Sequence, residues 1–282
     1  MGHGERFLDD GYFDVIEFCF MPFVSEFDRG DPIVGIPIFP RRTFTHSGWY
    51  VREGAGIQSA QDLAGRRVGA HSYQTAYSVL ARADLEKFHG VDWRAMTWVI
   101  PEDAAVPVAA ALPPPGLRIE HVKDLGQVVA ALEAGNIDAL FVPFPRALRM
   151  EGRPGIRALF PAQQDEEARY FKALGFVPII HAMATKRRLV DAHPSLPRAI
   201  FDVFVEAQRI ALQRWEDPAW SMLLGGGRVL SSEEQTYGEE AWRHGRARNR
   251  AALDHLLSAT ADHGIARRLL TVEELFLPID AG

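Results

Sequence analysis

The stretch that decides the fold runs from Ile36 to Val51 and reads I-P-I-F-P-R-R-T-F-T-H-S-G-W-Y-V. Its ends are apolar and its middle is polar, which is typical of a chain that leaves one sheet and enters another. Such a crossover forms the floor of a cleft between two lobes. An arginine there can bind a carboxylate through two parallel hydrogen bonds, and a histidine can transfer a proton near neutral pH. An edge strand with solvated arginines is the alternative, and the combination of residues favours the cleft.

A second extended and apolar stretch, from Phe176 to Ala184, contains one histidine, His181. We interpret it as the crossover by which the chain returns. The two crossovers predict that residues 1–50 and 181–282 form lobe one and that residues 51–180 form lobe two. Between them, short apolar runs alternate with helical patterns, which predicts an α/β class with largely parallel sheets.

Length and composition exclude several classes of function. The 282 residues are 47% hydrophobic, which is enough for one large domain or two lobes. The net charge of -6 argues against nucleic acid as a partner, because phosphate binding requires a basic surface. No apolar run approaches the roughly 20 residues of a membrane helix, and no signal peptide is visible, so a cytoplasmic protein is expected. The single cysteine, Cys19, lies between two phenylalanines and is predicted to be a buried, inert thiol.

We expect the start of the chain to lack one βα unit. A βα unit begins with a strand, and the residues before Leu8 are too few for a strand and a helix. Residues 13–18 therefore read as the second strand, and we expect lobe one to lack its first strand and helix. The native chain is then expected to begin roughly 30 residues or more upstream. The missing strand would also line the cleft, since ligands of open α/β sheets bind at the carboxyl ends of strands.

Several motifs resemble known proteins. The segment Gly56–Thr75 resembles the entry to the second lobe of type 2 periplasmic-binding-protein folds, in which D-L-x-G-x-x-V-G leads into a ligand-facing helix. More of the chain resembles the 4,5-dihydroxyphthalate decarboxylase-like family within that superfamily. The matching pieces are F-D-V at 13–15, I-P-I-F-P-R-R-T-F-T-H-S at 36–47, Y-Q-T-A at 73–76, G-F-V-P-I-I-H at 175–181, N-R at 249–250 and R-R-L-L-T-V-E-E-L-F at 267–276. This resemblance implies a two-lobed fold and the non-oxidative decarboxylation of a hydroxylated, phthalate-like aromatic carboxylic acid.

Two positions depart from the family pattern. Leu174 stands where the family usually has a threonine before the glycine of the return crossover. Near the C-terminus the segment A-W-R-H-G at 241–245 places His244 where the family usually has a tyrosine. Both changes would alter the pocket, so the substrate need not be dihydroxyphthalate itself.

The implied reaction assigns roles to the polar residues of the crossovers. The carboxylate must be held out of the ring plane and desolvated, and the ring carbon must receive a proton. Arg42 is expected to bind the carboxylate, with Arg41 as the second choice. Either His46 or His181 is expected to donate the proton, and the sequence does not separate them. The remaining substrate-binding candidates are Ser47, Tyr73, Gln74, Thr75 and, by resemblance alone, His244.

Metal chemistry and simple ligand binding are the alternatives. His46, His181 and a carboxylate could form a facial triad, but the sequence contains no H-x-H or H-E-x-x-H pair, which favours metal-free acid–base chemistry without a cofactor. The rival function is a solute-binding protein for a small anionic or heteroaromatic compound, whose partner would be a transporter permease. Otherwise the expected partner is a small aromatic carboxylate, with no nucleic acid or membrane, and homo-oligomerisation is left open. Fold alone does not decide between these functions.

Overall fold

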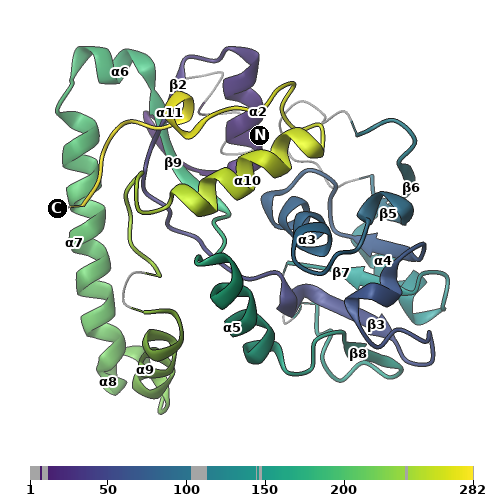
Figure 1. Cartoon of the computed structure of the whole chain (residues 1–282). Helices are drawn as coiled ribbons and strands as arrows, with labels where there is room; N and C mark the ends of the chain where they lie inside the picture. The colour runs from purple at the N-terminus through teal and green to yellow at the C-terminus, as the bar shows by residue number, and fades with distance from the viewer. Residues whose placement is uncertain are drawn as a thin grey trace.

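In a computed structural model the described residues of the chain form two β-sheets that are joined by two extended crossovers (Figure 1). The structure describes residues 7, 12–102, 113–143, 145, 148–238 and 241–281. The residues around Leu8, on which the expectation of a missing first strand rests, lie outside this range, and that expectation stays a prediction. Within the described residues, no helix combines the length and apolar character needed to cross a membrane.

The first sheet has three strands in the order β1-β9-β2. These strands are β1 (Val15–Cys19), β2 (Ile33–Ile36) and β9 (His181–Lys186), and helix α2 (Phe20–Arg29) connects the first two. Strand β9 is antiparallel to both neighbours, with Cys19 opposite His181 and Ile36 opposite Met183. The expectation of largely parallel sheets is therefore wrong here. The return crossover leads into β9 at the end of the sheet where β1 finishes. Strand β9 therefore runs in the direction opposite to β1.

The second sheet has six strands in the order β6-β5-β4-β7-β3-β8. They are β3 (Trp49–Arg52), β4 (Arg67–Ala70), β5 (Thr97–Pro101), β6 (Arg118–Val122), β7 (Ala139–Phe141) and β8 (Ile156–Ala158). Four strands are parallel, as expected, and β3 is antiparallel to β7 and β8. Gly69 in β4 is required by packing, because a Cβ there would lie 2.5 Å from Val128 of helix α4 (Leu125–Glu133).

Helices cover the sheets and extend beyond them. The remaining α-helices are α3 (Ala76–Lys87), α5 (Gln163–Leu174), α6 (Arg187–Ala192), α7 (Leu196–Glu216), α8 (Pro218–Ser221), α9 (Gly226–Tyr237), α10 (Arg250–Asp262) and α11 (Val272–Leu275). In the described part of the chain, short 3-10 helices also span His46–Gly48, Ala60–Leu63 and Trp93–Ala95. Helix α10 comes from the C-terminal part of the chain and packs against α3, so the two halves meet beyond the crossovers as well (Figure 1).

The two crossovers run side by side and form the hinge between the sheets. Thr43 donates its main-chain N–H to Pro178 (3.1 Å), and Ile180 donates to Arg41 (3.1 Å). Strands from Trp49 to Ala158 belong to the second sheet, whereas β1, β2 and β9 form the first. The lobe boundaries 1–50, 51–180 and 181–282 themselves stay a prediction.

A buried carboxylate ties the first crossover to helices from both halves of the chain. Asp84 of α3 is 2% exposed and accepts hydrogen bonds from Thr45 Oγ1 (2.7 Å) and from the hydroxyl of Tyr170 in α5 (2.9 Å). His255 of α10 approaches the same carboxylate with Nε2 at 3.4 Å. Because a buried carboxylate is costly without donors, these contacts fix the relative positions of the crossover, α3, α5 and α10.

Candidate functional site

Four polar side chains meet where the first sheet joins the hinge, and we call Glu17, Cys19, Arg41 and His181 the hinge cluster. His181 opens β9 directly opposite Cys19, the last residue of β1. Its Nδ1 lies 2.6 Å from Oε1 of Glu17, and Nε of Arg41 lies 3.8 Å from the same oxygen. The main chain of Arg41 accepts a hydrogen bond from Ile180 (3.1 Å), which holds it beside His181. The cluster thus combines a histidine, a carboxylate, a guanidinium and a thiol.

The tautomer of His181 follows from its partner. A carboxylate only accepts, so Nδ1 carries the proton that is shared with Glu17, and Nε2 is the second functional atom of the ring. Burial lowers the pKa of His181, although the Glu17 carboxylate raises it. The imidazole is therefore mostly neutral at pH 7 before a ligand binds. Additional negative charge nearby would raise the pKa and protonate Nε2.

Cys19 lies at the N-terminus of α2 and close to the N-terminus of α3. It precedes α2, and the main-chain amides of Phe20, Met21 and Ala76 favour the thiolate and so lower the pKa of its thiol. Since Ala76 is the first residue of α3, helix N-termini from both sides of the hinge converge on this atom. Burial raises the thiol pKa by more than these amides lower it, so the group is protonated at neutral pH. The side chain of Cys19 is partly rather than fully buried, so the prediction of a buried thiol holds only in part.

The side chain of Arg42 makes hydrogen bonds within the protein. Its guanidinium is buried and donates to the carbonyls of Val177 (3.4 Å) and Arg243 (3.1 Å) and to Oδ1 of Asn249 (2.6 Å). Its Nε has no hydrogen-bond partner among the described residues. Burial lowers the Arg42 pKa to about 10, so it remains a cation at pH 7. The side chain joins the first crossover to the return crossover and to the segment that precedes α10.

His46 lies outside the hinge cluster. Its side chain is 2% exposed, and neither ring nitrogen has a hydrogen-bond partner in the part of the chain that the structure describes. The ring packs among aromatic rings, with Phe160 at 5.1 Å, Tyr170 at 5.6 Å and His89 at 5.7 Å between centroids. Burial lowers its pKa. No group of three His, Cys, Asp or Glu side chains is arranged to hold a metal within the described residues, so the triad with His181 is not assembled.

The other substrate-binding candidates have structural partners. Tyr73 donates its hydroxyl to the His263 carbonyl (2.9 Å) and stacks on Arg82. Thr75 caps α3 and donates to Ser78 Oγ (3.1 Å). His244 is buried and accepts the main-chain N–H of Phe39 (3.2 Å), and burial, together with Arg42, lowers its pKa to about 4. The main-chain N–H of Gln74 donates to Ser72 Oγ (3.2 Å), and Ser47 Oγ lies 3.4 Å from the Tyr77 hydroxyl.

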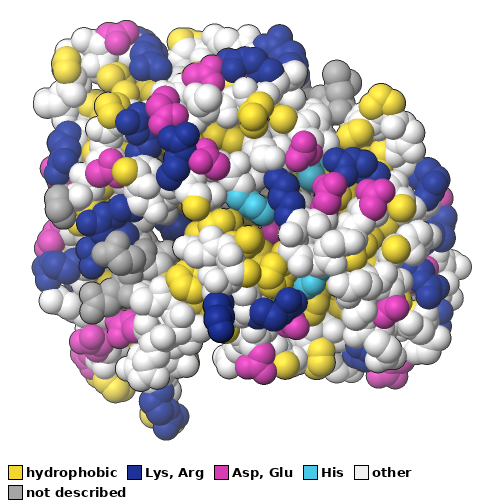
Figure 2. All heavy atoms as spheres, viewed as in Figure 1, with side chains coloured by type: hydrophobic (Ala, Val, Ile, Leu, Met, Phe, Trp, Pro, Cys, Tyr) yellow, Lys and Arg dark blue, Asp and Glu magenta, His cyan; other side chains and the backbone are white. Residues whose placement is uncertain are grey.

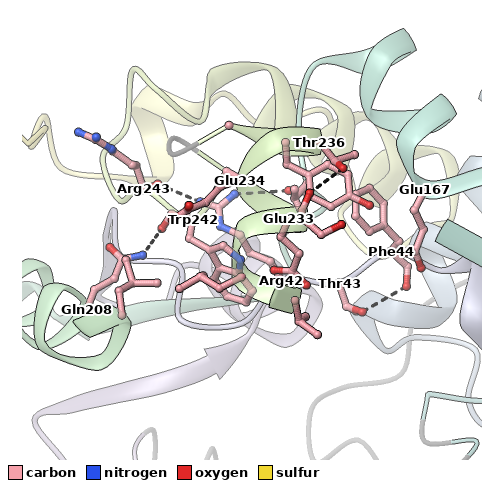
Figure 3. A pocket seen from close by; sticks show the side chains of 18 of the residues that line it. Arg42, Thr43, Phe44, Glu167, Gln208, Glu233, Glu234, Thr236, Trp242 and Arg243 are labelled. Atoms are coloured by element: carbon pink, nitrogen blue, oxygen red, sulfur yellow. Dashed lines mark hydrogen bonds between the residues drawn. The ribbon is translucent and has the colours of Figure 1, made fainter. Parts of the chain in front are cut away.

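A large open pocket of about 1200 Å³ lies beside the first crossover, between α5, α7 and α9 (Figure 3). Arg42, Thr43, Phe44 and Ser47 contribute to its wall. Glu167 of α5 and Glu233 of α9 also line it, and burial raises the pKa of both carboxyl groups. Of the predicted site residues, the pocket brings Arg42, Ser47 and His244 together, and its lining includes neither His181 nor Arg41.

Glu17 is the residue that the sequence reasoning missed. Side chains alternate across a strand, so Glu17 and Cys19 share one face of β1 while Ile16 and Phe18 point into the core. The available signal for Glu17 was its position as an acidic residue two positions before the end of a strand. It becomes meaningful once the antiparallel pairing with β9 brings His181 to the same place.

Comparison with known proteins adds a family resemblance. No protein-family model matches the chain. The chain is 28% identical over 252 residues to a 4,5-dihydroxyphthalate decarboxylase from Comamonas testosteroni, covering 88% of this chain and 76% of the relative. It is 29% identical over 148 residues to a 4,5-dihydroxyphthalate decarboxylase from Pseudomonas putida, covering 51% of this chain and 57% of that relative.

Solved structures agree on the fold. The periplasmic aliphatic sulphonate binding protein SsuA from Escherichia coli matches with a TM-score of 0.56 and 15% identity, covering 100% of this chain and 82% of that one. The desulfurization enzyme DSZB matches with a TM-score of 0.53 and 17% identity, covering 97% and 87%. These findings confirm the predicted resemblance: the chain is similar to 4,5-dihydroxyphthalate decarboxylases along most of its length and has the two-lobed α/β fold of type 2 periplasmic binding proteins.

Proposed function

We propose that the protein catalyses the non-oxidative decarboxylation of a hydroxylated, phthalate-like aromatic carboxylic acid at the hinge cluster. The observation that carries this proposal is the 2.6 Å contact between His181 Nδ1 and Glu17, with Arg41 beside it. It supplies a proton donor, a group that orients the donor and a cation for a carboxylate in one place. The activity named for the two similar decarboxylases supports the same reaction type.

Arg41 takes the carboxylate-binding role in this proposal. The terminal nitrogens of Arg42 already donate to Val177, Arg243 and Asn249. The Arg41 side chain is 50% exposed at the hinge and can present two parallel N–H groups to a carboxylate. A second carboxylate of a phthalate-like substrate is favoured near Cys19, where the N-termini of α2 and α3 converge.

His181 is the proton donor in this proposal, because His46 lies in an aromatic environment away from the cluster. Binding of a dianionic substrate raises the His181 pKa and protonates Nε2. The Nε2 proton forms a C–H bond at the ring carbon that bears the carboxylate, assisted by electron donation from a ring hydroxyl. The C–C bond then breaks, its electron pair restores the aromatic ring and carbon dioxide leaves. Solvent returns the proton to Nε2, so that atoms and charges balance.

The test is carbon dioxide release from 4,5-dihydroxyphthalate, with unsubstituted phthalate as the matched compound that lacks the hydroxyl groups. We expect release from the first compound and none from the second. His181→Gln should reduce kcat by at least about 100-fold, within the range of general acid catalysis. His193→Gln, which changes an exposed histidine just after α6, should leave kcat unchanged. If His46→Gln abolishes turnover and His181→Gln does not, the assignment of the donor is wrong.

The rival function is ligand binding without chemistry. It is favoured by the fold shared with the aliphatic sulphonate binding protein. Calorimetry separates the two functions, because a solute-binding protein would bind a small anion tightly and stoichiometrically while releasing no carbon dioxide from any hydroxylated aromatic acid.

A further inference from the structure

A second cavity, of about 280 Å³, lies between β8, an edge strand of the second sheet, and the start of α5. It adjoins the large pocket, because Ser47 and Gln163 line both, and its lining includes no residue of the hinge cluster. In the space-filling view, the surface between α5 and the second sheet shows apolar, basic and acidic side chains close together (Figure 2). The cavity has no role in the chemistry proposed at the hinge cluster.

Two polar side chains on the wall of this cavity are buried and lack hydrogen-bond partners. Tyr50 is 3% exposed, and no described residue hydrogen-bonds to its hydroxyl. His46 is 2% exposed, and both of its ring nitrogens are unpartnered within the described part of the chain. These nitrogens are closed off from solvent, so pairing with them requires a small rotation of the imidazole toward the cavity. Because buried polar groups are almost always hydrogen-bonded, the two side chains point to a ligand.

The charges around the cavity suit a ligand with a single negative charge. Arg157 lines the cavity and donates to the carbonyls of Ala158 (3.1 Å) and Ile57, and no described carboxylate pairs with it. Helix α5 starts at the same wall, and its N-cap residue Ala162 provides no side-chain acceptor for the first main-chain N–H groups, which favours an anion. Glu151 on the wall and the acidic residues in the first turn of α5 offset part of this positive charge. The balance favours one carboxylate over two.

We propose that this cavity is a second ligand site, which binds a single-ring aromatic monocarboxylate that carries ring hydroxyl groups. The ring packs against Phe160 and Met150, which line the cavity, and the carboxylate accepts from N–H groups of Arg157. A ring hydroxyl pairs with Tyr50 or with His46. A neutral imidazole has one donor and one acceptor nitrogen and so matches a hydroxyl, which both donates and accepts. Sites for drug-sized ligands have about 300–1000 Å³, so the volume of this cavity limits its occupant to one ring.

This ligand class includes the product of the proposed decarboxylation, and the connection to turnover, unlike the site itself, rests on the proposed function. Loss of one carboxylate from a dihydroxyphthalate leaves a dihydroxybenzoate, which has one ring, one negative charge and two hydroxyl groups. The substrate carries a second carboxylate, which the charge balance of the cavity disfavours. The cavity therefore selects the product over the substrate.

Isothermal titration calorimetry of the full chain with 3,4-dihydroxybenzoate tests the proposal. We expect binding that persists in Arg41→Ala, which disables the hinge cluster, and an affinity in that background that falls at least about 10-fold with Tyr50→Phe or Arg157→Gln. Arg118→Gln is the matched control, because Arg118 lies on β6, the opposite edge of the same sheet, and also donates to a main-chain carbonyl. It should change the affinity by less than about 2-fold. Catechol, which lacks the carboxylate, and benzoate, which lacks the hydroxyl groups, should each bind at least about 10-fold more weakly.

Nitrogen NMR of the chain labelled with ¹⁵N-histidine gives a second readout that needs no cavity variant to fold. The ring nitrogens of His46, assigned from their loss in His46→Gln, should shift when 3,4-dihydroxybenzoate is added. Unchanged His46 signals at saturation overturn the proposal, as does the absence of binding at about 10 mM ligand. Binding that is lost in Arg41→Ala but kept in Tyr50→Phe and Arg157→Gln also overturns it, because the ligand then occupies the hinge cluster alone.

Carbon dioxide release from 4,5-dihydroxyphthalate is measured separately, so that the two proposals fail independently. Binding that depends on Tyr50 and Arg157 without any release of carbon dioxide supports the second site and contradicts the proposed function. Release of carbon dioxide together with binding that neither cavity variant weakens contradicts the second site and leaves the proposed function in place.

Discussion

Replacing Glu17 by glutamine tests whether this carboxylate positions His181. The variant keeps the size of the side chain and removes its charge, and the 2.6 Å contact with His181 Nδ1 is weakened. A hydrogen bond to a charged group contributes about 1.5–3 kcal/mol. The Glu17 side chain is 41% exposed, so solvent screening reduces this to about 1–2 kcal/mol. We expect kcat/KM at pH 7 to fall roughly 5- to 30-fold.

The pH profile separates a positioning role from a structural one. Glu17 raises the pKa of His181 against the effect of burial, so its removal lowers that pKa. The donor acts in its protonated form, so activity is lost as the pH rises through the pKa. The basic limb of the profile in Glu17→Gln should therefore move to lower pH, and activity should recover partly on acidification. Glu53→Gln, at an exposed position in the turn that follows β3, is the control. An unchanged basic limb in Glu17→Gln would refute the reasoning.

Four further outcomes are expected. Arg41→Ala should weaken binding of a phthalate-like dianion by about 1–2 kcal/mol in calorimetry, and unchanged affinity would exclude Arg41 as a ligand-binding residue. Arg42→Ala should instead lower the free energy of unfolding in urea by about 2–4 kcal/mol, because three hydrogen bonds to buried acceptors are lost. Asp84→Ala should cost a similar amount, since it leaves the Thr45 and Tyr170 hydroxyls unpaired; a loss below about 0.5 kcal/mol would contradict this. Burial lowers the pKa of His89 and His244 to about 4, so the unfolded state binds more protons than the folded state below pH 6.5. The free energy of unfolding should therefore fall as the pH is lowered from 6.5 to 4, and it should fall less steeply in His244→Gln.

Local patterns predicted the crossovers and the α/β class because those features depend on neighbouring residues. The apolar ends and polar middle of Ile36–Val51 indicate an extended segment, whatever its position in the fold. The direction of β9 did not follow from its own sequence, because the direction of pairing is set by the path of the whole second lobe. The expected parallel arrangement holds for four strands of the second sheet and is wrong for the first sheet.

The choice among site residues depended on which way each side chain points. Adjacent residues of an extended segment face opposite sides, so Arg41 and Arg42 were not equivalent, yet nothing in their sequence shows which one is buried. The same alternation explains Cys19, whose neighbours Phe18 and Phe20 enter the core while it faces the hinge. His46 and His181 became distinguishable only through contacts with distant elements, namely Phe160 and Glu17.

The strand order β1-β9-β2 has a consequence for how the protein folds. The outer strands of this sheet are complete at Ile36, whereas the strand that joins them starts at His181, after the whole second sheet has been synthesised. Pairs so distant in sequence form late, because closing a long loop precedes any gain from the contact. The second sheet is contiguous in sequence and can form first. Glu17 and His181 meet only when β9 inserts, so the recovery of activity in a refolding experiment should lag behind the recovery of helical signal.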